Sequence, residues 1–153
     1  MKPLTAKYQA TKAVTTTVLA VAIVQLAACT ITQQVNPAAV SATEVCIIEN
    51  PKVRSGFVQE IQTTLMTNGY RYRMLPPTAQ ADDCPVTMTY VGRWSWDLTI
   101  YLSYARLQVF DNGSAAGDAV YDSTGGGGNM NKFIDAETKI RELVTQLLPA
   151  RKH

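Results

Sequence analysis

Residues suited to catalysis are scarce in this sequence. His153, the single histidine of the chain, is also its last residue, and chain ends fray too much to position a catalytic group. A Ser-His-Asp or Cys-His arrangement has no other histidine to use. Asp82 and Asp83 stand side by side between predicted elements, where a solvated turn is favoured over an acid–base pair. The sequence therefore predicts that the protein is not an enzyme.

A glycine-rich run at 125–129 invites comparison with loops that cradle phosphate groups. It lacks the Lys-Ser/Thr pair of a P-loop and the spaced glycines of a dinucleotide-binding turn. A flexible linker is the favoured interpretation, and a close approach by a partner's backbone is the alternative. No cofactor is predicted.

Two tryptophans separated by one residue are the strongest sign of a binding surface. They lie in the stretch 93–97, and side chains two apart on a strand point to the same face. Tryptophan and arginine are frequent anchors of interfaces. The opposing interpretation, that both rings fill the core beneath the helices, remains open. The candidate binding residues are Arg93, Trp94, Trp96, Tyr101 and Tyr104.

The amino terminus has the layout of a secretory signal. Lys2, Lys7 and Lys12 precede an apolar run over 13–28 that contains no charged residue. The run is short for a bilayer span, which needs about 20 predominantly apolar residues. Threonines at 15–17 dilute it further. A cleaved leader is therefore favoured over a transmembrane helix.

The leader ends in Leu26-Ala27-Ala28-Cys29, which resembles the lipobox of bacterial lipoproteins. The resemblance implies that 1–28 are a signal peptide and that Cys29 receives a diacylglyceryl group and becomes the new amino terminus. An ordinary signal peptide is the alternative, but the motif stands where a lipobox must stand. In the sorting rule of many Gram-negative lipoproteins, Asp after the cysteine retains the protein in the inner membrane. Thr30 therefore favours the outer membrane, facing the periplasm.

Removal of the leader changes the charge of the chain. Three of the fourteen basic residues leave with it, so that eleven remain against twelve acidic residues. The mature chain is nearly neutral and lacks the basic stripe that nucleic-acid binding requires. We predict no nucleic-acid partner.

The two remaining cysteines, Cys46 and Cys84, form an even pair in a compartment that permits disulfides. We predict that they are bonded, which would stabilise the fold by roughly 4 kcal/mol on the chain-entropy model. Two cysteines without a neighbouring histidine offer too few ligands for zinc, so no metal site is predicted. No base is present to activate a thiolate.

The chain after the lipid site divides into three parts. The segment 29–43 is polar and small and predicts a flexible tether spanning about 20 Å; Pro37 argues against the alternative of an amino-terminal strand. Residues 44–149 predict a single domain, and 150–153 a tail. Hydrophobic periodicity and turn signals predict strands over 45–49, 70–75, 85–91, 98–110 and 119–123, with helices from 55 to 68 and from 135 to 148.

Three local signals mark the ends of these elements. Ser55 is placed to cap the first helix, and Asn68-Gly69 to stop it. The run 111–114 (Asp-Asn-Gly-Ser) predicts a hairpin turn. On the second helix, Glu137 and Arg141 stand four apart and predict a surface ion pair.

The order of elements predicts an α+β two-layer sandwich, in which two amphipathic helices cover one face of a largely antiparallel sheet of four to five strands. With the lipobox, this layout resembles small periplasm-facing lipoproteins of Gram-negative envelopes, including accessory lipoproteins of transport and assembly machines. The resemblance implies a lipid-anchored binding or assembly module and transfers no catalytic residue. Its partners would be the membrane, through the lipid on Cys29, and an envelope protein, glycan or lipid. An enzyme of unrecognised type and a structural lipoprotein remain alternatives.

Overall fold

The computed structural model describes residues 30–151, so the predicted lipid site Cys29 and the terminal His153 lie outside the described residues. The described residues form strands and helices, and four consecutive strands separate the first α-helix from the helices at the end of the chain. These elements are β1 (Thr32–Asn36), β2 (Glu44–Ile48), α1 (Ser55–Thr67), β3 (Arg71–Leu75), β4 (Val86–Asp97), β5 (Thr99–Asp111), β6 (Ser114–Asp122), the short 3-10 helix η1 (Met130–Phe133) and α2 (Ala136–Leu147).

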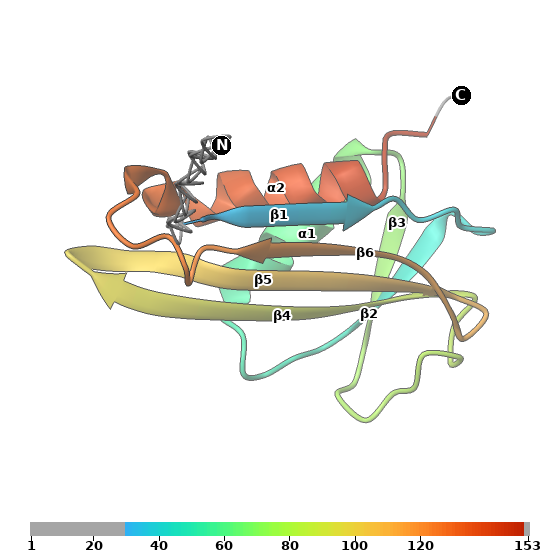
Figure 1. Cartoon of the computed structure of the whole chain (residues 1–153). Coiled ribbons are helices and arrows are strands. Elements are labelled where there is room, and N and C mark those ends of the chain that lie inside the picture. The colour runs from blue at the N-terminus through green and yellow to red at the C-terminus, as the bar shows by residue number, and fades with distance from the viewer. Residues whose placement is uncertain (1–29, 152–153) are drawn as a thin grey trace, which may run out of the picture.

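The strands form one six-stranded sheet in the order β1-β6-β5-β4-β2-β3. The pairs β1–β6, β6–β5 and β5–β4 are antiparallel, whereas β2 runs parallel to both β3 and β4. Figure 1 shows α1 and α2 lying together on one side of this sheet. The α+β fold is thus confirmed. The predicted sheet of four to five largely antiparallel strands is wrong, because the sheet is mixed and has six.

The parallel pairs arise from a strand-helix-strand unit. β2 leads into α1, and α1 crosses over the sheet to deliver β3 beside β2 in the same direction. A helical crossover is what a parallel pair requires, since a tight hairpin can join only antiparallel strands. The loop 76–85 then returns the chain so that β4 pairs with the other edge of β2. β2 becomes a central strand, and its Val45 and Ile47 are fully buried.

The predicted tether contains an edge strand. β1 pairs antiparallel with β6 from Thr32 opposite Asp122 to Asn36 opposite Asp118. The Gln33 amide donates to Glu142 of α2 at 2.7 Å. Beyond β1, the Ala38 N–H donates to the Leu147 carbonyl at 2.8 Å. The tether prediction is therefore wrong for this part of the chain, because long-range partners on β6 and α2 supply hydrogen bonds that the polar composition does not reveal.

The two helices begin in different ways. The second helix was predicted to begin at Asp135, and this residue caps α2 by accepting a hydrogen bond from the Thr138 N–H at 2.8 Å. The cap position of α1 is Arg54 rather than Ser55, and no side chain caps it. Gly69, part of the predicted Asn68-Gly69 stop of α1, has a φ of 84°, a conformation that glycine adopts without strain.

The core lies between the helices and the covered face of the sheet. The apolar stripe of α2 is buried as its spacing predicts, and Arg141 on its other side pairs with Glu60 of α1 at 2.8 Å rather than with Glu137. The most voluminous fully buried side chains come from both layers. They are Ile47, Phe57, Ile61, Leu65, Met88, Leu102, Leu107, Tyr121, Ile140, Leu143, Leu147 and Leu148.

The antiparallel half of the sheet contains a long hairpin. The tryptophan stretch does not leave the sheet but continues β4, which pairs with β5 as far as Asp97 opposite Thr99. Leu98 alone joins the two strands and has a φ of 62°. At the other end of β5, Asn112 and Gly113 have φ values of 48° and 76°, which confirms the predicted turn.

Candidate functional site

The structure begins to describe the chain one residue after the predicted lipid site. Thr30 lies against the glycine-rich loop, where its carbonyl oxygen would be 3.2 Å from a Cβ added to Gly125. Ile31 lies beside Gly126 in the same way, at 3.3 Å. The chain that emerges from the predicted lipid site is therefore in contact with the folded domain from the start.

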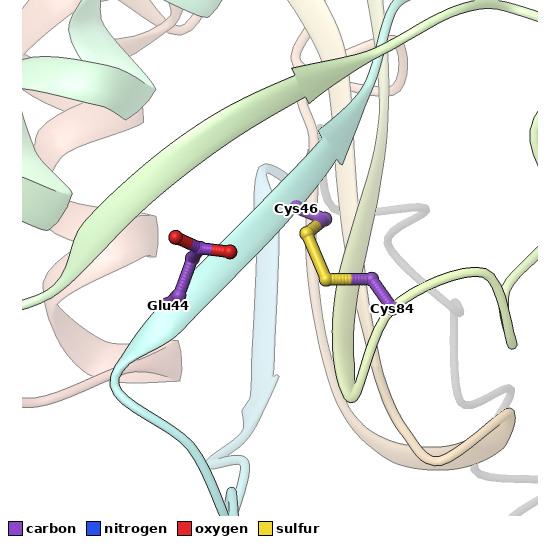
Figure 2. Close-up of side chains that lie close together, drawn as sticks. All are labelled: Glu44, Cys46 and Cys84. Carbon is purple, nitrogen blue, oxygen red and sulfur yellow. A yellow bond between two sulfur atoms is a disulfide. The ribbon is translucent and has the colours of Figure 1, made fainter.

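The predicted disulfide joins β2 to Cys84, which lies two residues before β4. Figure 2 shows Cys46 and Cys84 bonded through sulfur, with Glu44 close by on β2. The Cα atoms of the cysteines are 6.3 Å apart, within the usual range of a disulfide. The three side chains could be mistaken for a metal site, since their ligand atoms lie within 4.8 Å of one another. Sulfurs bonded to each other carry no thiolate charge, so this cluster is structural.

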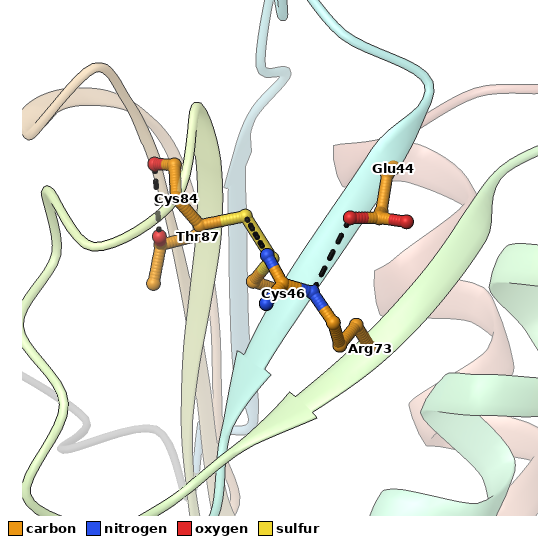
Figure 3. Close-up of a disulfide and its surroundings, with 5 residues drawn as sticks. All are labelled: Glu44, Cys46, Arg73, Cys84 and Thr87. Carbon is orange, nitrogen blue, oxygen red and sulfur yellow. Dashed lines mark hydrogen bonds and ion pairs between the residues drawn. A yellow bond between two sulfur atoms is a disulfide. The ribbon is translucent and has the colours of Figure 1, made fainter.

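Arg73 of β3 contacts both the disulfide and the Glu44 carboxylate (Figure 3). Its guanidinium donates to the Cys46 sulfur at 3.3 Å, and its Nε lies 3.3 Å from a Glu44 carboxylate oxygen. Both charged side chains are substantially exposed, 53% for the arginine and 39% for the glutamate. An exposed pair of this kind contributes at most about 1 kcal/mol. The cluster therefore belongs to the scaffold of β2, β3 and β4.

The five predicted binding residues do not share one surface. Trp94 lies on the helix-covered face, where its ring meets Phe57 edge-on at 6.1 Å. The Arg54 guanidinium lies 4.8 Å from the centre of the same ring. Gly92 provides room for this packing, because an added Cβ would approach the Phe57 ring to 2.8 Å. Trp94 thus agrees more closely with the core interpretation than with the interface interpretation.

Arg93 and Tyr104 lie on the opposite, uncovered face of the sheet. They are paired across β4 and β5, and the Arg93 guanidinium lies 5.2 Å from the centre of the Tyr104 ring. The next residue, Ala105, is fully buried on the helix side, so Tyr104 points away from the helices. This pair of side chains is therefore separate from Trp94, which lies on the other face.

Tyr101 belongs to a third environment, formed with η1. Its ring meets Phe133 edge-on at 5.4 Å. The ammonium of Lys132 lies 5.5 Å from the centre of the same ring and binds the Asp97 carboxylate. The Lys132 side chain is almost completely buried. Lys132 also donates to the Gly127 carbonyl. The glycine-rich loop is thus joined to the end of the β4–β5 hairpin.

Trp96 differs from the other four because its side chain is largely exposed. It is 74% exposed, and its cross-strand partner Ile100 is 54% exposed. Leu98 between them is 79% exposed. We call Trp96, Leu98 and Ile100 the apolar tip. Leu98 and Ile100 were not among the residues predicted from the sequence to bind a partner. The alternation of apolar residues at 96, 98 and 100 was the sequence signal that could have indicated the apolar tip.

A groove of about 470 Å³ lies between the closed end of the β4–β5 hairpin and the start of α2. Arg54 and Asp135 supply its charges. Hydrogen bonds from the N–H and the hydroxyl of Thr138 hold the pKa of Asp135 below its usual range. The carboxylate therefore stays ionised as a helix cap, which leaves it poorly suited to proton transfer. The lining residues are Arg54, Trp94, Thr99, Ile100, Tyr101, Leu102, Phe133, Ile134, Asp135 and Ala136.

Comparison with known proteins finds similarity only at the level of structure. No protein-family model and no curated protein sequence matches the chain. Two structures of the PelC dodecamer from Paraburkholderia phytofirmans, one of them of a substituted variant, superpose with TM-scores of 0.53 and 0.52 at 13% and 12% identity. Each covers 80% of this chain, and the match spans 100% and 99% of the PelC chains. At this identity the likeness shows a shared fold.

A minor lipoprotein from Acinetobacter baumannii also aligns, at 12% identity over 75% of this chain and 100% of its own. Its TM-score of 0.32 is too low to indicate a shared fold. Within residues 30–151, no helix combines the length and the apolar character needed to cross a bilayer.

Proposed function

We propose that the protein is a lipid-anchored module of the cell envelope that works by binding rather than by catalysis. A lipid on Cys29 would hold it to the periplasmic side of the outer membrane, as the lipobox and Thr30 favour. The domain would then present its uncovered surfaces to an envelope partner. Several acidic groups that could serve an enzyme are engaged in the fold: Glu60 with Arg141, Asp97 with Lys132, and Glu142 with Lys139.

One observation carries this proposal: the chain enters the sheet immediately after the predicted lipid site. β1 begins at Thr32, so only Thr30 and Ile31 stand between Cys29 and a hydrogen-bonded strand. A lipid on Cys29 would hold the domain directly at the membrane surface rather than on a long tether. A domain held so closely would keep the same side turned toward the periplasm, and a fixed orientation of this kind suits a binding module.

The uncovered face of the sheet supports a binding role. The exposed Arg93 lies on the half-buried ring of Tyr104 there, and arginine and tyrosine are enriched among the residues that contribute most to binding at interfaces. Helices cover the other face (Figure 1). An envelope partner would therefore meet this pair.

The anchor is tested by expressing the full chain in a Gram-negative host and measuring the intact mass of the membrane-bound form. We expect a mature protein that begins at Cys29 with added lipid, and a Cys29→Ala variant that loses both the lipid and the membrane fraction. Membrane-bound, unprocessed protein in both strains would contradict the anchor.

The binding face is tested by cross-linking in intact cells. We expect an Arg93→Glu, Tyr104→Ala variant to lose cross-linked partners while it keeps its thermal unfolding midpoint and its membrane fraction. Lys52→Glu, in an exposed loop, is the control for charge reversal. If both variants retain the partners of the wild type, this face is not the binding surface.

A further inference from the structure

Large apolar side chains that contact water gather at one end of the molecule. Among the described residues, six large apolar side chains are exposed, and three of these form the apolar tip of Trp96, Leu98 and Ile100. A fourth, Met130, is 68% exposed and belongs to η1. η1 is joined to the tip because Lys132 of η1 binds Asp97. Grouping of this kind marks an interaction surface, whereas single exposed apolar residues do not.

The turn of the tip is occupied by an unfavourable residue. Leu98 has a φ of 62°, in the left-handed region that glycine and asparagine adopt readily and leucine does not. Its side chain is 79% exposed, so packing within the domain does not compensate for this conformation. Strain of this sort persists at positions that serve function. An apolar side chain at the outermost point of the hairpin is therefore better explained by what it contacts outside the domain.

The tip lies at the end of the domain where the chain emerges from the predicted lipid site. Thr30 contacts Gly125, the neighbouring Gly127 accepts a hydrogen bond from Lys132, and Lys132 binds Asp97 beside the tip. These contacts link the first described residue to the hairpin. Figure 1 shows the beginning of β1 and the closed end of β4 and β5 on the same side of the molecule. A lipid on Cys29 would emerge at this end.

We propose that the apolar tip inserts into the head-group region of the same membrane that holds the lipid on Cys29. This second contact would fix which end of the domain faces the bilayer and would leave the uncovered sheet face turned sideways to partners. The inference deepens the proposed function and rests on its lipid anchor for the direction of insertion.

The chemistry of the tip suits a bilayer interface. Tryptophan concentrates at membrane–water interfaces, where the ring contacts acyl chains and its N–H contacts water or head groups. The tip is a two-stranded ribbon, so its two strands pair their backbone groups with each other instead of leaving them unpaired in the membrane. The adjacent Asp97 is neutralised by Lys132.

The test uses the full mature protein, lipidated and reconstituted into vesicles of phosphatidylethanolamine and phosphatidylglycerol. Trp94→Phe leaves Trp96 as the only tryptophan. We expect its emission to move to shorter wavelength on reconstitution, and to lose most of its intensity when phosphatidylcholine brominated on the acyl chains is included. Trp96→Phe, which retains the half-buried Trp94, should lose little intensity.

A matched pair of variants separates the tip from apolar exposure in general. In the Trp94→Phe background, Leu98→Asn with Ile100→Ser should abolish the quenching. Met66→Ser is the control, because Met66 is 55% exposed, as Ile100 is at 54%, and lies at the far end of α1. Asparagine suits the backbone of Leu98, so the tip variant should unfold at the same temperature or higher. A loss of quenching in the tip variant could then not be attributed to unfolding.

Three results would overturn the proposal. The first is Trp96 emission that brominated lipid leaves unchanged, and the second is quenching in the tip variant equal to that in the Trp94→Phe protein. The third is an oligomer that the tip variant no longer forms in sedimentation, because the tip would then be a contact between copies of the chain. The intact mass of the same sample decides the anchor independently. A protein without lipid whose Trp96 is still quenched would refute the proposed anchor and keep the tip, whereas a lipidated protein without quenching would do the reverse.

Discussion

At the scale of single residues, the charged carboxylate of Asp135 has a structural role. It caps α2 by accepting hydrogen bonds from the N–H and the hydroxyl of Thr138. These bonds favour the ionised form and lower the pKa of the carboxyl in the folded protein. The stabilisation is therefore fully present at pH values above the unfolded pKa of about 3.9, and it is lost as the pH falls through the lower folded pKa.

Replacing Asp135 tests this role directly. We expect Asp135→Ala to lower the free energy of unfolding by about 1 kcal/mol at neutral pH, because a helix cap is lost. Asp135→Asn is the matched control, since asparagine caps equally well without a titrating proton. Chemical denaturation between pH 3 and pH 7 should show a smaller fall of stability with acid in both variants than in the wild type. An unchanged pH profile would argue against the cap as a source of acid sensitivity.

The geometry of single residues also explains why the five predicted binding residues do not form one surface. Adjacent positions on a strand point to opposite faces, so Arg93 and Trp94 could never have shared a surface. The exposure of Trp96 follows from its place at the end of a hairpin that extends past the helices. That place depends on where the strands end, which the residues 93–97 do not encode by themselves.

At the scale of elements, β1 is the feature that most changes the picture of the anchor. It docks where β6 has a glycine, Gly117, beside it. A Cβ at this position would approach the Asn36 carbonyl oxygen to 2.6 Å and the Ala38 Cα to 2.7 Å. Glycine inside a strand often marks such a close approach of another backbone. The side chain that is missing from β6 makes room for the chain that leads from the lipid site.

Gly117→Ala should therefore loosen β1 without unfolding the remainder of the domain. We expect a loss of about 1–3 kcal/mol, as for other overpacked sites, and faster hydrogen exchange confined to the amides of 32–38. Gly128→Ala is the control, because an added Cβ there meets nothing within 4 Å. Equal exchange of β1 in both variants would show that its docking does not depend on this contact.

At the scale of the whole molecule, the disulfide connects two parts of the fold that the chain builds separately. Cys46 lies in β2 of the parallel half, and Cys84 precedes β4, the strand that opens the antiparallel hairpin. The two cysteines are 38 residues apart in sequence. Closing a loop of this length removes conformational entropy from the unfolded chain and stabilises the fold by roughly 4 kcal/mol.

The double variant Cys46→Ala, Cys84→Ala should lose up to this roughly 4 kcal/mol of unfolding free energy and keep the same fold by circular dichroism. Arg73→Ala, which removes only the exposed arginine over the bond, should change stability by at most about 1 kcal/mol. Urea denaturation of the three proteins gives the comparison. A double variant as stable as the wild type would show that β2 and β4 hold together without the bond.

Features that depend on a residue's own preferences and its near neighbours could be predicted from the amino-acid sequence. Asn112 and Gly113 form the turn, Asp135 caps its helix, and α2 buries its apolar stripe, because local backbone preference and periodicity govern these choices. By contrast, two arrangements could be seen only in the folded protein: β2 runs parallel to its neighbours, and β1 joins the sheet with Thr32 opposite Asp122. The same holds for the position of the apolar tip, at the end of the domain where the chain emerges from the predicted lipid site. Such arrangements depend on contacts between residues far apart along the chain, and no local pattern specifies them.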